Sequence, residues 1–378
     1  MNAVAPARKT KALGRIALID LTREYGAYRS EFLAAVERVL DGMHLLNGEE
    51  GKAFEREMAD YLGVRHVRGV ASGTDALYLS ILAAGLGPGD EVLIQANSFV
   101  AAAEALYRAG VRAVPVDIRL DDLGPDLGEV QAKFGERTRG ILVVHLYGFP
   151  VDLEPIMAFA AARSVAVIED CSHAHGATLN GQRVGSFGIA GAFSLGVVKN
   201  LAAYGDAGMI STDDEELAER VKLLGTHGQK GKNNHIFYGG NSRLDELHAA
   251  MLRVKLRHLE ARNARRAEIA AYYTACLRGH VTTPCEDPAR THVYHQYVIR
   301  TTWREALKTH LQHYEIETGI HYPQPIHLQP AWKNVYGETP AMPRAEQAAR
   351  EILSLPVHAD LTDEEVEGVA DAVVSFFK

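Results

Sequence analysis

The sequence predicts an α/β protein built on a large, mainly parallel β-sheet. Short apolar runs alternate with longer stretches in which apolar residues recur at helical spacing, the pattern of strands joined by crossover helices. Two of the runs, Ile141–Val144 and Val165–Ile168, are apolar at every position. Parallel strands that are buried on both faces have this composition. A smaller α+β domain is expected to follow at the C-terminal end.

Helical and strand patterns succeed one another along most of the chain. Residues 1–14 are expected to form a flexible tail, and apolar spacing then predicts helices over Phe32–Val39 and Ala53–Leu62. The strands of the sheet are expected over Val67–Val70, Glu91–Ile94, Ala113–Val116, Gly140–Val144, Val165–Ile168, Ala192–Leu195 and Met209–Ile210. Helices are expected between several of them, over Leu77–Ala84, Ser98–Ala109 and Leu153–Ala162.

The C-terminal part begins with a long charged helix. Its pattern runs from about Asn241 to Arg278, and a strand over Tyr294–Arg300 and a helix over Trp303–Leu311 follow. The last helix is expected to start at Thr362, because a threonine followed by acidic residues can cap the amides of a first turn. We therefore expect a large domain (residues 15–250) and a small domain (residues 251–378), with the long helix as their joint.

The composition excludes several classes of protein. The chain has 378 residues, of which 47% are hydrophobic and 23% charged, as is typical of soluble globular proteins. The net charge of −8 argues against nucleic-acid binding, and the basic stretch Arg253–Arg266 is interpreted as a solvated helix surface. No apolar run approaches the roughly 20 residues of a membrane helix. Since the start also lacks the apolar core of a secretory signal, we expect a cytoplasmic protein.

Metal and disulfide chemistry are not expected from this sequence. The chain has 3 cysteines, Cys171, Cys276 and Cys285, which are too scattered for a disulfide framework or a metal cluster. The histidines have no spacing typical of metal ligands.

Ser72-Gly-Thr74 is the first of three features at the carboxyl ends of predicted strands, where open α/β sheets bind ligands. Small residues at a helix N-terminus let backbone amides approach a phosphate group, which the helix dipole also favours. The segment is also typical of a plain N-cap without a ligand, and on this motif alone the N-cap is the commoner explanation.

The second feature is the acidic pair Glu169-Asp170 directly after an apolar strand. A carboxylate at the end of a buried strand needs a partner, and a protonated pyridine nitrogen is one such partner. Alternatively, one of the two acids faces solvent or caps the following segment. The third feature is Lys199, which is flanked by Val197, Val198 and Leu201. Most lysines are solvated, but one enclosed by apolar residues has a lowered pKa and can act as a Schiff-base nucleophile. Together the three features outline a pyridoxal phosphate site.

Longer motifs resemble a known family over practically the whole chain. The sequence is similar to the DegT/DnrJ/EryC1/StrS sugar aminotransferases, which are pyridoxal-phosphate enzymes of the aspartate aminotransferase fold (fold type I). The motifs that carry the resemblance are Ala71–Leu77, Val143–Gly148, Ile168–Asp170 with Ala174–Ala177, Lys199–Leu201 with Tyr204–Asp206, Asn241–Glu246, and Gly319–Pro323 with Ile326–Pro330.

The resemblance implies a role for each residue of a candidate site. It implies that Lys199 forms the Schiff base with the cofactor and later moves the proton, and that Asp170 contacts the pyridinium nitrogen. The remaining implied cofactor contacts are Gly73, Thr74 and Ser194 at the phosphate, Phe99 stacked on the ring, His173 at the phenolic oxygen, and Asn241 reaching the phosphate in a neighbouring subunit. It further implies that His321, Tyr322 and His327 line the substrate side, and that the protein is a homodimer with shared active sites.

The sequence departs from the family pattern at several of these positions. His173 stands where the family usually has glutamine, so that its protonation state becomes a variable; alternatively, His173 only packs beside the ring. Gly196-Val-Val198 replaces the usual residues before the lysine, and Gly240 replaces a frequent tyrosine before Asn241. These changes predict a reshaped loop before Lys199 and a different contact between subunits.

The resemblance implies a transaminase that acts on a nucleotide-linked sugar. The motif forms look most like members that convert a 3-keto-6-deoxyhexose, carried on dTDP, to the 3-amino sugar with L-glutamate as amino donor, by ping-pong kinetics. Enzymes acting at C-4 or on an inosose share the scaffold and remain alternatives. A pyridoxal-phosphate-dependent sugar dehydratase is disfavoured because such relatives carry histidine in place of Lys199. A domain that binds the cofactor without turnover is the non-enzymatic alternative.

Overall fold

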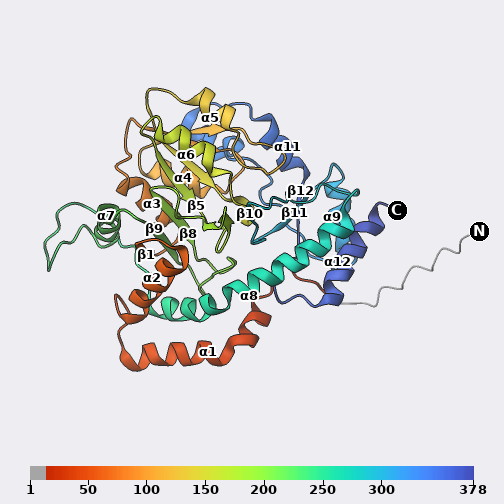
Figure 1. Ribbon diagram of the computed structural model, residues 1–378, viewed down its shortest axis with the longest axis horizontal. Helices are drawn as coiled ribbons and strands as arrows, with labels where there is room; N and C mark the ends of the chain where they lie inside the picture. Colours follow the sequence, from red (N-terminus) through yellow and green to blue (C-terminus); the bar gives the residue numbers. More distant parts are fainter. Residues whose placement is uncertain (1–13) are drawn as a thin grey trace, which may run out of the picture.

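The structure is a computed structural model that describes residues 14–378, with a seven-stranded sheet between layers of helices (Figure 1). Except for Gly14, the predicted N-terminal tail lies outside the described residues. The α-helices are α1 (Leu21–Gly42), α2 (Glu49–Leu62), α3 (Gly73–Ala83), α4 (Ala101–Arg108), α5 (Leu127–Lys133), α6 (Leu153–Ala161), α7 (Glu215–Gly225), α8 (Glu246–Leu277), α9 (Arg304–His313), α10 (Pro330–Tyr336), α11 (Pro343–Glu351) and α12 (Asp363–Phe376). Short 3-10 turns cover Leu146–Gly148 (η1) and Ile326–Leu328 (η2).

The seven strands of the main sheet lie in the order β1-β9-β8-β5-β4-β2-β3. Their bounds are β1 (His66–Val70), β2 (Glu91–Gln95), β3 (Arg112–Val116), β4 (Thr138–Val144), β5 (Ala166–Asp170), β8 (Ala190–Ser194) and β9 (Gly208–Thr212). Neighbours from β3 to β8 run parallel, whereas β9 is antiparallel to both β8 and β1. The predicted α/β fold with a mainly parallel sheet is confirmed, and each predicted strand of this sheet is present.

Alternate residues of the central strands are buried against different helices. Ile141 and Val143 of β4 pack with α5 and α6, while Leu142 and Val144 pack with α3 and α4. Since successive side chains of a strand point to opposite faces, a strand covered by helices on both faces must be apolar at every position. This is why the run Ile141–Val144 shows no polar alternation.

In the C-terminal part, a small two-stranded sheet packs against three helices. Strand β11 (Tyr297–Arg300) pairs with β12 (Ile352–Leu355), and this pair shares a core with the end of α8, with α9 and with α12. Thr362 caps α12, since its side chain accepts the amide hydrogen of Glu365 and the Glu365 carboxylate accepts that of Thr362, as the sequence predicted. Strand β12 was not predicted, because it directly follows helix α11 without a turn residue.

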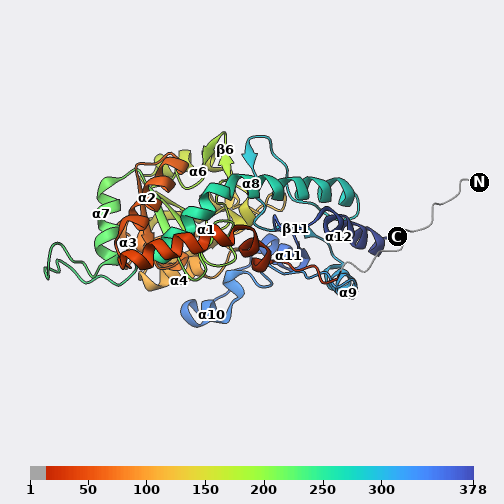
Figure 2. The same ribbon diagram turned by 90° about the horizontal axis from the view of Figure 1, so that it is seen from below.

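Helix α8 extends beneath both sheets and passes without a break through the predicted domain boundary at residues 250 and 251 (Figures 1 and 2). The boundary itself stays a prediction. A third small sheet, with strands β6 (Thr178–Leu179), β7 (Gln182–Arg183) and β10 (Arg290–Thr291), also links the two parts of the chain. Among the described residues, no helix is long and apolar enough to span a membrane.

The interpretation of the basic stretch of α8 as a solvated surface is wrong for several of its residues. Lys255 is buried, with its Nζ 2.7 Å from Oε2 of Glu24 on α1, which lies alongside α8 (Figure 2). Arg262 contacts Asp360 at 2.6 Å, and Arg253 contacts Glu50 at 2.6 Å. The basic residues of α8 are therefore largely neutralised by acids of distant segments, a pairing that the charge pattern of one helix does not reveal.

Candidate active site

A cavity of about 230 Å³ opens where the ends of β4, β5 and β8 meet the start of α3. It brings together seven of the residues predicted for the cofactor site: Gly73, Thr74, Phe99, Asp170, His173, Ser194 and Lys199. The sequence analysis did not select Ser172 and Asp206, which also line it. The signal for Ser172 was present, since it follows Asp170 by two positions at the end of the same strand.

The N-terminus of α3 forms one end of this cavity. Ser72 is its N-cap, with Oγ accepting the amide hydrogen of Asp75 at 3.1 Å, a contact that is compatible with both interpretations of this motif. The Ser72 side chain does not accept the amides of Gly73 and Thr74. These amides also have no partner within the helix, since they belong to its first turn. A Cβ on Gly73 would lie 2.5 Å from Cβ of Ser194. Glycine therefore lets the helix end approach Ser194, so that amides and hydroxyl share one wall.

The neighbouring acids Glu169 and Asp170 point to opposite faces of the sheet. Glu169 is fully buried on the side away from the cavity and accepts amide hydrogens from Gly185 (2.8 Å), Phe187 (2.9 Å) and Gly188 (2.8 Å). Asp170 faces the cavity, and one of its oxygens accepts the Ser172 amide at 3.0 Å. Neither acid faces solvent, whereas the contact with the Ser172 amide shows that Asp170 caps the segment after β5.

Asp170 is a buried carboxylate that lacks a full counter-charge. Burial raises its pKa above the ordinary value, although the Ser172 hydrogen bonds and the charge of Lys199 act in the opposite direction. A cation bound in the cavity would stabilise the ionised form. The site is therefore suited to a ligand whose protonated nitrogen can reach this strand end.

Lys199 lies in the loop between β8 and β9 and lines the same cavity. Burial lowers its pKa from 10.5 to about 8, against the opposing effect of Asp170. A larger fraction of this amine is neutral near neutral pH than of a solvated lysine, and a neutral amine is the form that attacks a carbonyl. The sequence attributed this enclosure to Val197, Val198 and Leu201; Leu201 is fully buried, but Val197 and Val198 are 40% and 41% exposed. The cavity wall, not the preceding valines, desolvates the lysine.

The four remaining predicted residues do not line this cavity. Tyr322 is nearest, with its ring 5.3 Å from that of Phe99, and the His321 carbonyl accepts a hydrogen bond from the Tyr147 hydroxyl. His327 is fully buried elsewhere, with Nε2 3.4 Å from the carboxylate of Glu346 on α11. Turn η2 directs this ring into the protein, so its placement does not support a contact with substrate.

Asn241 is exposed and lies apart from the cavity of its own chain. It precedes α8, and its side-chain oxygen accepts a hydrogen bond from Arg243 at 3.0 Å. The segment just before it projects from the body beside α7 (Figures 1 and 2), with Tyr238 fully exposed. Its exposure leaves this side chain accessible to a second copy of the chain.

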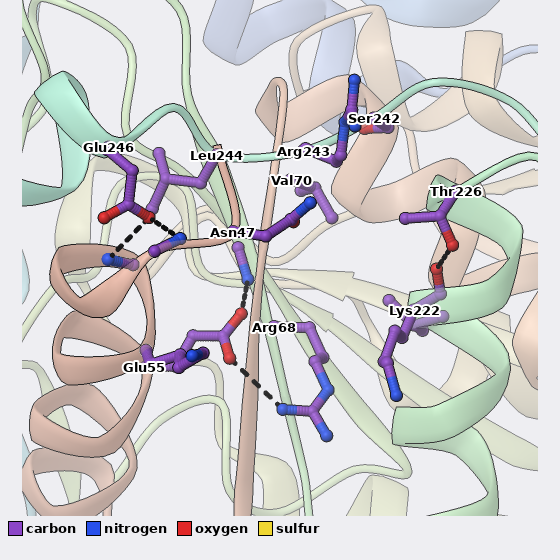
Figure 3. A pocket seen from close by; sticks show the side chains of 15 residues that line it. Asn47, Glu55, Arg68, Val70, Lys222, Thr226, Ser242, Arg243, Leu244 and Glu246 are labelled. Carbon is purple, nitrogen blue, oxygen red and sulfur yellow. Dashed lines mark hydrogen bonds and ion pairs between the residues drawn. The ribbon is translucent and has the colours of Figure 1, made fainter. Parts of the chain in front are cut away.

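A second, larger cavity of about 390 Å³ lies between α2, β1, α7 and the start of α8 (Figure 3). Its carboxylates already have partners: Glu246 accepts the amides of Gly48, Glu50 and Gly51, and Glu55 pairs with Arg68. The two lysines that line it, Lys52 and Lys222, are exposed and pair with Glu49 and Glu219. The chemistry is therefore assigned to the smaller cavity at Lys199.

One buried cluster has the composition of a metal site. His145, Glu169 and Cys171 place possible ligand atoms within 4.8 Å of one another. However, His145 Nδ1 accepts the Val151 amide at 3.0 Å, and its Nε2 donates to Glu169 at 3.1 Å. Both ring nitrogens are thus engaged, and the cluster is explained as a hydrogen-bonded support for strands β4 and β5.

The cavity at Lys199 has the donor set that pyridoxal phosphate requires. Helix amides and a serine hydroxyl at one end suit a phosphate group, the Asp170 carboxylate suits a protonated ring nitrogen, and the Lys199 amine suits an aldehyde. The close approach of Gly73 to Ser194 fixes the distance between helix and strand at the phosphate end. The residues that are present therefore fit this cofactor.

Comparisons with known proteins agree with this arrangement. The sequence pattern of the DegT/DnrJ/EryC1/StrS aminotransferase family matches residues 27–374. The chain is 40% identical, over 95% of its length and 95% of the relative, to dTDP-3-amino-3,4,6-trideoxy-alpha-D-glucose transaminase of Streptomyces venezuelae. It is 42% identical to dTDP-3-amino-3,6-dideoxy-alpha-D-galactopyranose transaminase of Aneurinibacillus thermoaerophilus, over 95% of this chain and 98% of the relative.

A solved structure shows the same fold over nearly the whole chain. The crystal structure of S. venezuelae DesV in complex with a ketimine intermediate superposes with a TM-score of 0.94 at 40% identity, covering 96% of this chain and 99% of that chain. The aspartate-aminotransferase-like fold expected from the sequence is thereby confirmed. The chain belongs to the DegT/DnrJ/EryC1/StrS aminotransferase family, and it is an enzyme, a transaminase.

Proposed function

We propose that this transaminase uses pyridoxal 5'-phosphate to convert a dTDP-linked 3-keto-6-deoxyhexose to the 3-amino sugar, with L-glutamate as amino donor. The observation that carries the proposal is the convergence of Lys199, Asp170 and the α3 N-terminus on one cavity. The sugar, its dTDP carrier and the C-3 position are supported by the two transaminases named above, whose names both specify a dTDP-linked 3-amino sugar.

Five residues of the cavity are assigned tasks in this reaction. Pyridoxal phosphate, when bound, supplies an electron-accepting ring and carries the amino group from donor to acceptor. Asp170 keeps a proton on the ring nitrogen, and the Nζ of Lys199 takes a proton from the substrate carbon and returns it. The amides of Gly73 and Thr74, with the Ser194 hydroxyl, bind the phosphate.

The substrate side of the site is proposed to lie at the aromatic pair Phe99 and Tyr322. Phe99 is 53% exposed and lines the cavity, and Tyr322 continues this wall beyond it. His321 is held behind Tyr322 by a 2.8 Å hydrogen bond between its Nδ1 and the Ser354 hydroxyl. An apolar wall with a few fixed polar groups is suited to a deoxysugar ring.

A spectrum of the purified protein tests the cofactor and the donor together. Protein loaded with pyridoxal phosphate is expected to show the visible band of lysine-bound cofactor, and L-glutamate is expected to convert it to the spectrum of the amine form. A dTDP-linked 3-keto-6-deoxyhexose should then restore the original band, whereas a 4-keto isomer and an inosose should not. The absence of any band after loading contradicts the cofactor assignment, and reversal by the 4-keto sugar alone moves the reaction to C-4.

Shared active sites in a homodimer form the second part of the proposal. Asn241 does not line the cavity of its own chain, and we assign it to the phosphate of the other subunit. Lys199→Ala and Asn241→Ala are each expected to be nearly inactive. When the two are co-unfolded and refolded in equal amounts, random pairing in a symmetric dimer restores about a quarter of wild-type activity, because half of the dimers contain one intact site. If mixing restores nothing although Asn241→Ala alone is inactive, the site is not shared in this way.

A further inference from the structure

We propose that His173 is held as a neutral imidazole with its hydrogen on Nε2, so that it presents one fixed hydrogen-bond donor to the cofactor's phenolic oxygen. This inference rests on the proposed function for the identity of the acceptor. It also answers the question that the sequence raised, because a histidine in place of glutamine introduces a group that can change its charge.

The first argument is the backbone partner of the ring. The amide nitrogen of Tyr147 lies 3.2 Å from Nδ1 of His173. An amide can only donate, so Nδ1 is the acceptor and carries no hydrogen, and a neutral imidazole then carries its hydrogen on Nε2. No described residue accepts a hydrogen bond from Nε2, and the imidazole lines the cavity. The ring therefore has one donor left for a ligand.

The segment Val143–Gly148 positions this amide. Tyr147 has a left-handed backbone (φ 62), which turns the chain sharply after β4. The next residue, Gly148 (φ 96), lies so close to the ring's own segment that a Cβ would be 2.8 Å from the His173 carbonyl oxygen. Tyr147 is further anchored through its hydroxyl, which donates to the His321 carbonyl. A rigid turn therefore holds the donor against Nδ1.

A second histidine packs on the other side of the ring. The rings of His173 and His295 are 4.4 Å apart, and Nδ1 of His295 lies 3.2 Å from Oδ1 of Asn200. The Asn200 amide nitrogen donates to Asn263 (2.9 Å) and to the Val293 carbonyl (3.0 Å), which fixes the orientation of the amide. His295 must then donate from Nδ1. These contacts fix the His295 ring beside His173 and connect it to the loop of Lys199.

The surroundings also oppose a positive charge on His173. Burial lowers its pKa well below 6.5, and the charge of Lys199 acts in the same direction. The other titratable groups around the ring or in the same cavity are His175, His295, His321, Asp170 and Asp206. Asp170 is engaged by Ser172 and faces Lys199. A neutral donor is therefore favoured over an imidazolium in the range in which a transaminase works.

The tautomer can be measured directly in the protein without cofactor. Histidine labelled with ¹⁵N in the ring distinguishes bare from protonated ring nitrogens, and comparison with His173→Gln assigns the signals. The expected result is a bare Nδ1 and a protonated Nε2 that do not change between pH 6 and 8. A signal that titrates in this range, or the reverse tautomer, overturns the proposal. Because this measurement needs no loaded enzyme, it separates a failure of this inference from a failure of the proposed function.

The contact with the cofactor is tested by a pH titration of the visible band of loaded protein. A donor to the phenolic oxygen stabilises its ionised form. Because His173→Ala removes this donor, it is expected to raise the pH midpoint of the band's titration by about one to two units. His173→Gln keeps a donor without a titratable ring, and its midpoint should remain close to that of the wild type. An unchanged midpoint in His173→Ala excludes the contact. If the wild type shows a second transition that is missing in His173→Gln, the imidazole itself titrates and the proposed neutral state is wrong.

Discussion

Replacing Lys199 by alanine is expected to abolish both the visible band of bound cofactor and turnover. The side chain is assigned two tasks, covalent attachment and proton transfer, and alanine removes the atom that performs both. A positioned acid–base group alone contributes about 10²–10⁴ in rate, so we expect kcat to fall by on the order of 10⁴-fold or more. The measurement combines an absorbance spectrum of loaded protein with the rate of amino transfer from L-glutamate.

The control for this variant is Lys308→Ala on α9, where the lysine is exposed and remote from the cavity. It should keep both the band and the rate. Turnover of Lys199→Ala at the level of this control would show that another group performs the chemistry, and the assignment of Lys199 would be wrong.

The lowered pKa of Lys199 predicts how cofactor loading depends on pH. Only the neutral amine attacks the aldehyde, and its pKa is about 8 instead of the ordinary 10.5. The rate at which the visible band develops should therefore rise through pH 8 and level off above it. A rate that continues to rise towards pH 10 would mean that the amine is solvated before the cofactor binds.

Much of the fold follows from local patterns in the sequence. The central strands could be predicted because they are apolar on both faces. The start of α12 at Thr362 could be predicted because its capping box lies within four consecutive residues. Strand β12 escaped prediction, since it continues directly from α11 and becomes a strand only by pairing with β11. The pairing of Lys255 with Glu24 also depends on how distant helices pack. Patterns within one segment do not contain such information.

Site residues could be predicted from the sequence where they lie at the end of a strand. They could not be predicted where their position depends on packing between distant segments. Gly73, Asp170 and Lys199 each follow or precede a strand of one sheet, so the topology brings them together. The burial of His327 results from the direction of turn η2, for which the sequence has no signal. The neutral state of His173 depends on a Tyr147 amide contributed by another strand end.

Asp170→Asn is expected to reduce turnover strongly while leaving the cofactor-free protein stable. Asparagine keeps an oxygen for the Ser172 amide, which now hydrogen bonds to Oδ1 at 3.0 Å, so the free energy of unfolding should change by no more than about 1 kcal/mol. The negative charge that keeps the ring nitrogen protonated is lost, however. Removing one preorganised electrostatic contact reduces kcat by about 10²–10³-fold, and a steady-state assay at saturating cofactor measures this.

Glu169→Gln is the matched control, since the same chemical change is made one residue away on the same strand. The Glu169 carboxylate accepts hydrogen bonds from three amides and from His145, and a glutamine NH₂ group would face some of these donors. Leaving buried donors without an acceptor destabilises a protein by about 1–3 kcal/mol each. Glu169→Gln should therefore lower the unfolding temperature, whereas Asp170→Asn should lower kcat. If instead Glu169→Gln lowers kcat and Asp170→Asn lowers the unfolding temperature, the carboxylate at the cofactor is Glu169. The side chains of β5 would then have been assigned to the wrong faces of the sheet.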